Sequence, residues 1–288
     1  MKKIITLFAA LLVCYVASAA TTKTETIEDQ GLTRSYYLYL PDNLPADAPL
    51  VFILHGYGGS ASSYLNNSSL SFKALAEEYK VALCYPQATR DPKPNTGWNV
   101  YYPWQIDKMQ VDDCEFICAL AKHLQATYNL SAKNTFLTGM SNGGEMCYLM
   151  AYRKPKEFAA IASMAGLTLV EMAKRHNYTE PVAFMEVHGT GDKTSRWEGD
   201  PTDQYGWGAY LAVPVAVNAV AAANKCMYQE TTELPQIKNR VIRHRYYGSP
   251  SGKEVWFYEV RNGGHNWATD SFDSCRTIME FFMLNMTK

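Results

Sequence analysis

The chain has 288 residues, of which 47% are hydrophobic and 19% charged, and its formal net charge at pH 7 is −1. This near-neutral charge gives no electrostatic basis for binding nucleic acid or an anionic membrane, so we expect neither as a partner. The length, without a Pro/Ser-rich linker, low-complexity tract or repeat, favours one large α/β domain over two small ones.

The first 19 residues have the composition of a cleavable secretory signal peptide. Lys2 and Lys3 precede an apolar run that is too short for a stable membrane span, and small residues follow at 17–19. We therefore expect a mature chain of residues 20–288 that is secreted or periplasmic and not bound to a membrane. The short start led by lysine suggests a bacterial source.

The hydrophobic pattern then predicts a hairpin followed by buried strands that alternate with helices. The expected strands lie at 24–30, 34–41, 49–56, 81–87, 135–137, 158–166, 181–189 and 254–264, and the expected helices at 71–80, 111–130, 145–153, 214–225 and 271–285. This alternation indicates a single α/β domain, with one doubly wound, mostly parallel sheet flanked by helices. Catalytic groups in such folds gather at the carboxyl ends of the strands.

Residues 139–143, Gly-Met-Ser-Asn-Gly, fit the G-x-S-x-G nucleophile elbow between a predicted strand and a predicted helix. The serine of such a turn has a strained backbone, and side chains at 139 and 143 would collide with neighbouring backbone. Glycine at both positions leaves the Ser141 hydroxyl exposed, and the following helix start stabilises developing negative charge. The alternative is a Gly-rich turn without a catalytic role, which the five residues alone do not exclude.

A serine hydroxyl needs a base, and in this architecture the partners follow in the order Ser, Asp or Glu, His. His265 lies on a Gly-rich loop after the last strong strand, and it is the predicted base. Asp192 follows the strand 181–189 and two glycines, and it is the predicted acid. His188 precedes this acid, so its order is wrong, and we expect a buried structural histidine there. The predicted triad is Ser141, Asp192 and His265.

Acyl transfer also needs hydrogen-bond donors for the oxyanion. The segment "ILHGYGGS" at 53–60 resembles an oxyanion loop in its position after a strand and before the elbow. We predict that the backbone N–H groups of Tyr57 and Asn142 are the two donors, each worth about 2.7–4 kcal/mol in the transition state. The alternative for the first loop is an ordinary glycine turn. A P-loop is excluded because no Gly-Lys-Ser/Thr follows these glycines.

Aromatic residues cluster at 97–105 and 196–210, with a mixed composition that is typical of stacking platforms for sugar or phenolic rings. The alternative is that individual rings pack against the sheet. The predicted substrate-binding residues are Trp98, Trp104, Trp197, Trp207 and Trp267, the first four as a rim over Ser141.

Six cysteines follow the signal segment, which permits disulfides in any of 15 connectivities. Cys114 and Cys118 lie one helical turn apart and are not expected to pair, while Cys84 and Cys147 are expected to be buried thiols. A zinc site is less favoured, because no CxxC or HxxxH spacing occurs. No cofactor motif is present, and the proposed chemistry requires neither a metal nor a cofactor.

Taken together, these motifs resemble the secreted polyhydroxybutyrate depolymerase and feruloyl esterase group of α/β-hydrolases, which is related to carbohydrate esterase family one. The matching segments are "PLVFILHGYGGS", "GWN", "VDDCEFI", "TGMSNGGEM", "VHGTGD" and "GGHNW", in that order. The resemblance places the nucleophile, acid and base of the family on Ser141, Asp192 and His265. The chain departs from the family at 193–199, where Val-Pro-Tyr is usual, and at 267–269, where many relatives have Trp-Pro-Gly.

The resulting hypothesis is an exported serine esterase that hydrolyses feruloyl or acetyl esters on plant cell-wall polysaccharide or oligosaccharide. A polyhydroxyalkanoate depolymerase is the nearest alternative, although no separate polymer-binding domain or linker is evident. A serine peptidase of the prolyl-oligopeptidase type is less favoured, because the mature chain is too short for a propeller domain. A non-catalytic glycan-binding protein would predict the loss of a triad residue, and all three are present.

Overall fold

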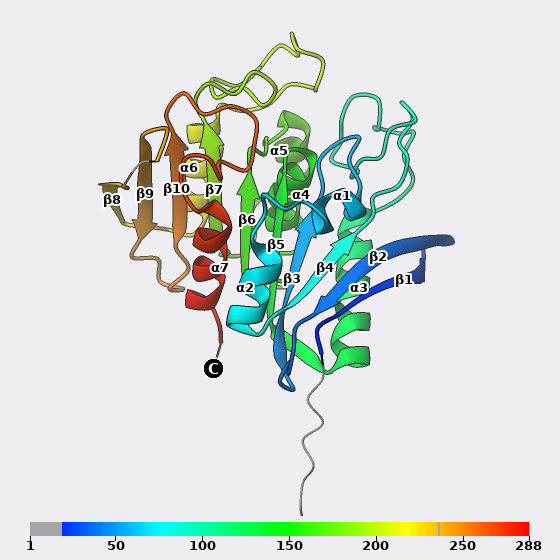
Figure 1. Cartoon of the computed structure of the whole chain (residues 1–288). Helices are drawn as coiled ribbons and strands as arrows, with labels where there is room; N and C mark the ends of the chain where they lie inside the picture. The colour runs from blue at the N-terminus through cyan, green and yellow to red at the C-terminus, as the bar shows by residue number, and fades with distance from the viewer. Residues whose placement is uncertain (1–18, 236, 288) are drawn as a thin grey trace, which may run out of the picture.

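The computed structural model describes residues 19–235 and 237–287, which form one ten-stranded sheet with helices on both faces (Figure 1). The strands are β1 (Thr21–Asp29), β2 (Leu32–Leu40), β3 (Ala48–Leu54), β4 (Ala82–Pro86), β5 (Leu130–Met140), β6 (Ala160–Met164), β7 (Ala183–Gly189), β8 (Tyr228–Glu233), β9 (Val241–Tyr247) and β10 (Val255–Val260). The helices are α1 (Ala61–Leu65), α2 (Phe72–Tyr79), α3 (Asp113–Tyr128), α4 (Asn142–Arg153), α5 (Val170–Arg175), α6 (Val213–Ala223) and α7 (Ser274–Leu284). The predicted signal peptide, apart from its last residue, lies outside the described residues.

The strand order across the sheet is β1-β2-β4-β3-β5-β6-β7-β10-β9-β8. Neighbours from β4 to β10 are parallel, and antiparallel pairs complete both edges. The predicted doubly wound, mostly parallel sheet is therefore confirmed. Two strands were not predicted, β8 and β9. Strand β8 forms an edge and is exposed along nearly its whole length, so its sequence lacks the apolar pattern of a buried strand.

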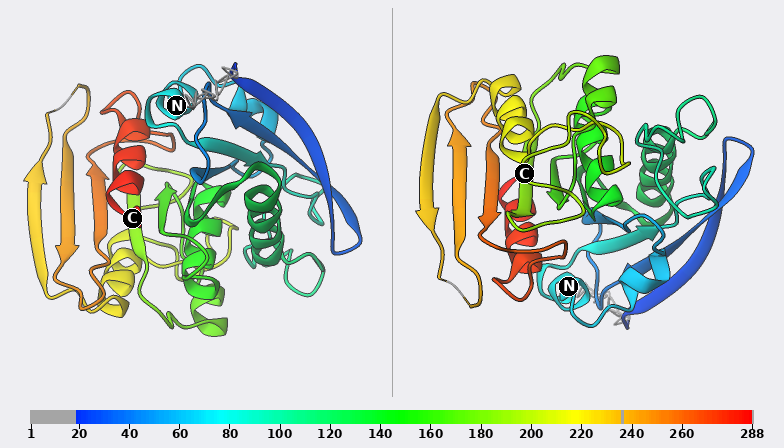
Figure 2. Two further views of the ribbon diagram at one scale, coloured as in Figure 1. Left: turned by 90° about the horizontal axis from the view of Figure 1, so that it is seen from below. Right: turned by 90° about the horizontal axis from the view of Figure 1, so that it is seen from above.

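Two hydrophobic cores lie on opposite faces of the sheet. Helices α3, α4 and α6 cover one face, and α2 and α7 cover the other (Figure 2). Strands β3, β4, β6 and β7 are buried at every residue, which explains their continuous apolar runs. Because the central strands are parallel, their carboxyl ends meet at one edge, and the loops that carry the candidate catalytic residues start there.

The six cysteines after the signal segment all have free thiols, so none of the possible disulfides is formed. Cys114 and Cys118 are unpaired on α3, as predicted. Cys84 and Cys147 are the predicted buried thiols, and burial raises the pKa of both well above its ordinary value. Among the helices of the described residues, none combines the length and the apolar character that crossing a membrane requires.

A buried ion pair joins β2 to α3 and to residues 97–105, which we call the aromatic loop. Arg34 Nη2 lies 2.8 Å from Asp113 Oδ1, and the guanidinium packs on the ring of Phe116. The other oxygen, Asp113 Oδ2, accepts a hydrogen bond of 2.8 Å from the backbone N–H of Asn99. The ion pair therefore helps to hold the aromatic loop at the carboxyl edge of the sheet.

Arg34→Ala should lower the free energy of unfolding by about 3–5 kcal/mol, because it leaves the Asp113 carboxylate buried without its cation. Urea unfolding followed by circular dichroism measures this change. Arg240→Ala is the control, because it breaks an exposed pair with Glu233 and should alter stability little. Equal losses in the two variants would contradict a structural role for the buried pair.

Candidate active site

Ser141 lies in a sharp turn between β5 and α4, as predicted. Its backbone angles are φ 58° and ψ −122°, a region that non-glycine residues rarely occupy. The Ser141 N–H donates a hydrogen bond of 2.8 Å to the carbonyl of Met164 at the end of β6, which ties the turn to the sheet. Strain held at one residue by surrounding structure is a common feature of active sites.

The glycines that flank the serine are required by close backbone contacts. A Cβ on Gly139 would lie 2.6 Å from the carbonyl carbon and oxygen of Gly143. A Cβ on Gly143 would lie 2.5 Å from the carbonyl oxygen of Leu54 and 2.8 Å from that of His55. The predicted collisions are therefore confirmed. The same contacts press the start of α4 against the loop that follows β3.

Asp192 and His265 are hydrogen-bonded to each other. The Asp192 side chain is fully buried, and its Oδ2 lies 2.7 Å from Nδ1 of His265. Its Oδ1 accepts hydrogen bonds of 2.8 Å from the backbone N–H groups of Thr194 and Ser195. The carboxylate thus places the proton of a neutral imidazole on Nδ1 and leaves Nε2 free to accept one.

Glycines also bring together the two loops that carry this pair. A Cβ on Gly189, at the end of β7, would lie 2.2 Å from the carbonyl oxygen of Gly263, on the loop after β10. The N–H of Gly191 donates to the same carbonyl at 2.9 Å, and Asn262 N–H donates to Thr190 Oγ1. The glycine-rich segments therefore allow the backbone approach that positions His265 beside Asp192.

His188 is buried, as predicted, but it also contacts the acid. Its Nδ1 lies 2.8 Å from Glu186 Oε1, and its Nε2 donates to the carbonyl of Ser195 at 2.8 Å and lies 3.7 Å from Asp192 Oδ2. Burial alone would lower the pKa of His188, but the hydrogen bond and charge of Glu186 outweigh it and raise that pKa. Sequence reasoning missed Glu186, although a glutamate within an otherwise apolar strand was a signal for a buried partner.

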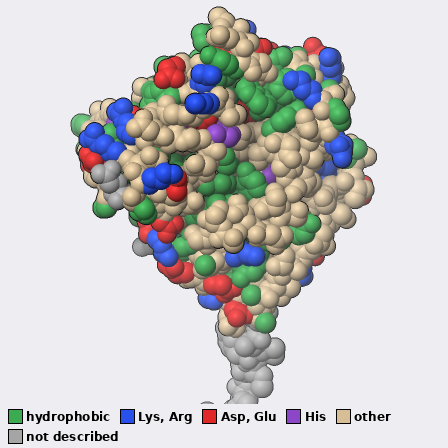
Figure 3. Space-filling view, turned by 45° about the horizontal axis from the view of Figure 1, so that its top comes forward, with side chains coloured by type: hydrophobic (Ala, Val, Ile, Leu, Met, Phe, Trp, Pro, Cys, Tyr) green, Lys and Arg blue, Asp and Glu red, His purple; other side chains and the backbone are tan. Residues whose placement is uncertain are grey.

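The structure brings Ser141 and His265 to the same edge of the sheet, at the ends of β5 and β10. Within residues 19–235 and 237–287 it has no hydrogen bond between Ser141 Oγ and His265. Catalytic hydrogen bonds are often long or poorly aligned in a ligand-free site and shorten in the substrate complex. Figure 3 shows this face of the molecule, where histidine reaches the surface in a hollow beside hydrophobic side chains.

The loop after β3 lies against the elbow, as an oxyanion loop must. A Cβ on Gly56 would be 3.3 Å from the Cβ of Ser141. The Gly56 carbonyl is held by the Gly59 N–H at 3.0 Å and by Nδ1 of His55 at 2.8 Å. The backbone N–H groups of Tyr57 and Asn142 donate no hydrogen bond to other groups of the described chain, so both can serve a substrate oxygen.

His55 was not identified from the sequence, although it comes directly before the glycines of this loop. It is fully buried, and burial lowers its pKa to about 4, so the ring is neutral at physiological pH. Its Nε2 accepts from the Ala88 N–H, which leaves the proton on Nδ1 for the Gly56 carbonyl. His55 therefore orients the peptide group that carries the Tyr57 N–H.

The predicted rim of tryptophans is only partly present. Trp98 is wrong as a rim residue: it has no exposed surface, and its indole N–H donates to the carbonyl of His55. Trp267 is also wrong as a substrate contact, because it is 6% exposed and packs on Phe72. Trp197 stacks on Phe257 and does not line the site pocket. These three tryptophans pack within the protein and do not line the Ser141 side of the site.

Trp104 and Trp207 belong to one cluster of aromatic rings, and Trp207 is the member of the two that reaches the serine. Trp104 stacks on Tyr102 with 4.5 Å between ring centroids, and Trp207 contacts both rings. Tyr57 packs edge-on against the same group. Of the five predicted tryptophans, only Trp207 borders the space next to Ser141.

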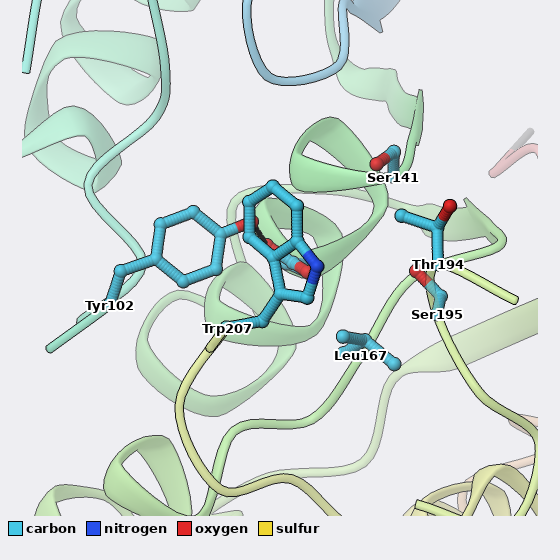
Figure 4. A pocket seen from close by; sticks show the side chains of 7 residues that line it. Tyr102, Ser141, Leu167, Thr194, Ser195 and Trp207 are labelled. Carbon is cyan, nitrogen blue, oxygen red and sulfur yellow. Dashed lines mark hydrogen bonds between the residues drawn. The ribbon is translucent and has the colours of Figure 1, made fainter. Parts of the chain in front are cut away.

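A pocket, which we call the Ser141 pocket, opens beside the serine (Figure 4). It is lined by Tyr102, Ser141, Glu145, Leu167, Thr194, Ser195 and Trp207. Tyr102 and Trp207 face Thr194 and Ser195 across it, and Ser141 lies at its edge. Its cavity volume is about 10 Å³, which is room for about one water molecule.

In the part of the chain that the structure describes, no group of three or more His, Cys, Asp or Glu side chains is arranged to hold a metal ion.

Strand order and elbow together define an α/β-hydrolase with a serine at the nucleophile position. The acetyl xylan esterase from Aspergillus awamori has the same fold, with a TM-score of 0.63 over 91% of this chain and 99% of that structure at 17% identity. The predicted fold class is therefore confirmed.

The family model described as esterase PHB depolymerase matches residues 34–196, which is more than half of the chain. Poly(3-hydroxyalkanoate) depolymerase C from Paucimonas lemoignei is 28% identical over 92% of this chain and 66% of its own length. Feruloyl esterase B from Neurospora crassa is 31% identical over 46% of this chain and 43% of its own. The chain belongs to the esterase PHB depolymerase family and is a carboxylic ester hydrolase of the serine type. It spans about two thirds and under one half, respectively, of these two relatives.

Gly143→Ala should reduce stability by about 1–3 kcal/mol and also lower kcat/KM, because the added Cβ meets carbonyl oxygens that cannot move without displacing the oxyanion loop. Urea unfolding and ester hydrolysis measure the two effects. Gly264→Ala is the control for stability, since a Cβ there meets no atom within 4 Å. Wild-type stability and turnover in Gly143→Ala would contradict the close contact.

Proposed function

We propose that this protein is an exported serine carboxylesterase in which Ser141, His265 and Asp192 form a catalytic triad. The observation that carries the proposal is the hydrogen bond between Asp192 and His265, at the same sheet edge as a serine in a strained elbow. Structural cores also contain histidine–carboxylate pairs, but this one is part-exposed and lies next to a pocket that contains the serine.

In the proposed reaction, Ser141 Oγ attacks the ester carbonyl and gives its proton to His265 Nε2. The buried Asp192 carboxylate stabilises the resulting imidazolium through Nδ1. The backbone N–H groups of Tyr57 and Asn142 donate to the oxyanion, and the start of α4 adds its positive dipole end. The imidazolium then protonates the leaving alcohol, and a water activated by His265 hydrolyses the acyl-enzyme.

The dimensions of the Ser141 pocket favour a short acyl group. A polysaccharide cannot enter a cavity of about 10 Å³, so the sugar stays outside and the acyl group enters. A methyl group, comparable in size to one water, fits this space, whereas a feruloyl ring would require Tyr102 and Trp207 to move. Of the two predicted ester types, acetyl esters on polysaccharide or oligosaccharide are therefore better supported than feruloyl esters.

Polyester depolymerisation is the second candidate, and it is supported by the similarity to the Paucimonas enzyme over 92% of this chain. The narrow Ser141 pocket favours acetyl release over a branched hydroxyacyl chain. Export is supported by the composition of residues 1–19, which is the composition expected of a signal peptide.

Ser141→Ala should fold normally and lower kcat for p-nitrophenyl acetate by about 10⁴-fold or more, because only binding and oxyanion stabilisation remain.

Asp192→Asn should lower kcat for the same ester by about 10⁴-fold, since it loses the carboxylate that fixes the His265 tautomer. The matched control is Asp200→Asn, whose carboxylate caps a loop by accepting from the N–H groups of Gln204 and Tyr205. Equal losses at 192 and 200, in folded variants, would show that the acid is wrongly assigned.

Acyl preference is measured by comparing kcat/KM for an acetylated xylo-oligosaccharide with that for a feruloylated one. We expect the acetyl ester to be the better substrate. Trp207→Ala should enlarge the pocket and reduce the preference, whereas Trp197→Ala, which removes a ring outside the pocket, should leave it unchanged. A wild-type preference for the feruloyl ester would contradict the size argument and favour feruloyl esters as the substrate.

A further inference from the structure

Glu145 places a buried carboxyl in the wall of the Ser141 pocket. It lies on the first turn of α4 and is 2% exposed. Its Oε2 accepts hydrogen bonds from the Tyr102 hydroxyl and from Asn142 Nδ2. Its Oε1 accepts no hydrogen bond from the described part of the chain. This oxygen is not closed off from solvent. Because Glu145 lines the Ser141 pocket, the oxygen without a protein donor is the one that the pocket leaves open to water.

We propose that Glu145 is a specificity-determining residue that restricts the Ser141 pocket to two-carbon acyl groups. The inference rests on the proposed function, in which the acyl group enters this pocket. No role for position 145 followed from the elbow motif, because the motif ends at Gly143.

The restriction has a solvation component. An acyl chain longer than acetyl would extend from the carbon bonded to Ser141 toward the wall and displace water from Glu145 Oε1. A carboxyl oxygen that loses its water without gaining another donor is destabilised. The Tyr102 hydroxyl and the Asn142 amide already donate to Oε2, so they do not compensate.

The restriction also has a steric component. The Glu145 side chain occupies the space behind a cavity of about 10 Å³. It cannot turn aside easily, because its donors are anchored: Asn142 is fully buried and also bonds both the N–H and the carbonyl of Trp98. Tyr102 is fixed by its stacking on Trp104. A longer chain therefore meets both a polar oxygen and a wall that does not yield.

The charge of Glu145 should change near neutral pH, because burial raises its pKa to about 7. The ionisable group in contact with it is Tyr102, whose pKa burial raises well above its ordinary value, so this phenol stays protonated. Tyr57, on the loop after β3, packs against the Tyr102 ring. Beyond the Thr194–Ser195 wall lie the hydrogen-bonded pair Asp192 and His265 and the buried pair Glu186 and His188.

An ionised carboxylate holds water more strongly than a neutral carboxyl does. The raised pKa means that the neutral form predominates below pH 7 and the carboxylate above it. Discrimination against longer acyl groups should therefore increase as the pH rises through 7.

The test measures kcat/KM for p-nitrophenyl acetate and p-nitrophenyl butyrate at pH 6 and pH 8, and takes their ratio. An effect of pH that is common to the two esters cancels in this ratio. In the wild type the acetyl-to-butyryl ratio should rise several-fold between pH 6 and pH 8. Glu145→Gln, which keeps the size but cannot ionise, should give the same ratio at both pH values.

Glu145→Ala removes both the oxygen and the bulk, so the ratio should fall by about ten-fold or more in favour of butyrate. Glu180→Gln is the matched control, because this exposed residue precedes β7, at the opposite end of the sheet, and pairs with Lys156. It should retain the wild-type ratio and its pH dependence.

The outcomes separate this inference from the proposed function. Activity on both esters with one unchanged ratio in wild type, Glu145→Gln and Glu145→Ala would overturn the role of Glu145 alone. Failure of the wild type to hydrolyse either ester would overturn the proposed function and this inference with it. Should Glu145→Ala not fold by circular dichroism, the pH dependence in wild type and its loss in Glu145→Gln decide.

Discussion

The contact between the elbow and the loop after β3 is the constraint on which the rest of the site depends. Without a side chain at Gly143, the start of α4 can approach the carbonyl groups of Leu54 and His55. That approach holds Ser141 in a conformation that would otherwise cost about 1–3 kcal/mol. It also packs the start of α4 against the loop that carries Tyr57. A single backbone contact thus fixes the serine turn, the loop after β3 and the positive end of the α4 dipole relative to one another.

Buried ionisable groups surround this point unevenly. On one side, the His188 ring lies between the carboxyl groups of Glu186 and Asp192. Asp192, which bonds His265, therefore has a potential cation, His188, at a distance of 3.7 Å. On the other side, Glu145 has hydrogen-bond donors but no cationic partner among residues 19–235 and 237–287, and burial raises its pKa. The second arrangement suits a carboxyl whose charge changes near neutral pH. Asp192 and Glu145 thus lie in one site but in different electrostatic environments.

The loop at 193–199, where the chain departs from the family pattern, serves both sides of the site. The backbone N–H groups of Thr194 and Ser195 fix the Asp192 carboxylate, and the same two residues line the Ser141 pocket. A change of side chains in this loop can therefore alter the pocket while the backbone keeps the acid in place. The aromatic residues divide in a similar way. Trp98 stabilises the loops from within the core, while Trp207 limits the space beside the serine.

Local sequence was sufficient for the central alternation of strands and helices, for the elbow and for the pairing of Asp192 with His265, because each depends on periodicity, glycine positions or chain order. The exposed strand β8 carries no such pattern, and it was missed. Sequence composition likewise could not separate Trp98 and Trp267, which are buried, from Trp207, since burial depends on which loops pack together. His55 and Glu145 depend on partners far along the chain, the Ala88 N–H and the Tyr102 hydroxyl, and Glu186 depends on its burial beside His188. Only the tertiary structure decided these, because hydrogen bonding and desolvation act through space, whereas a sequence pattern reports distance along the chain.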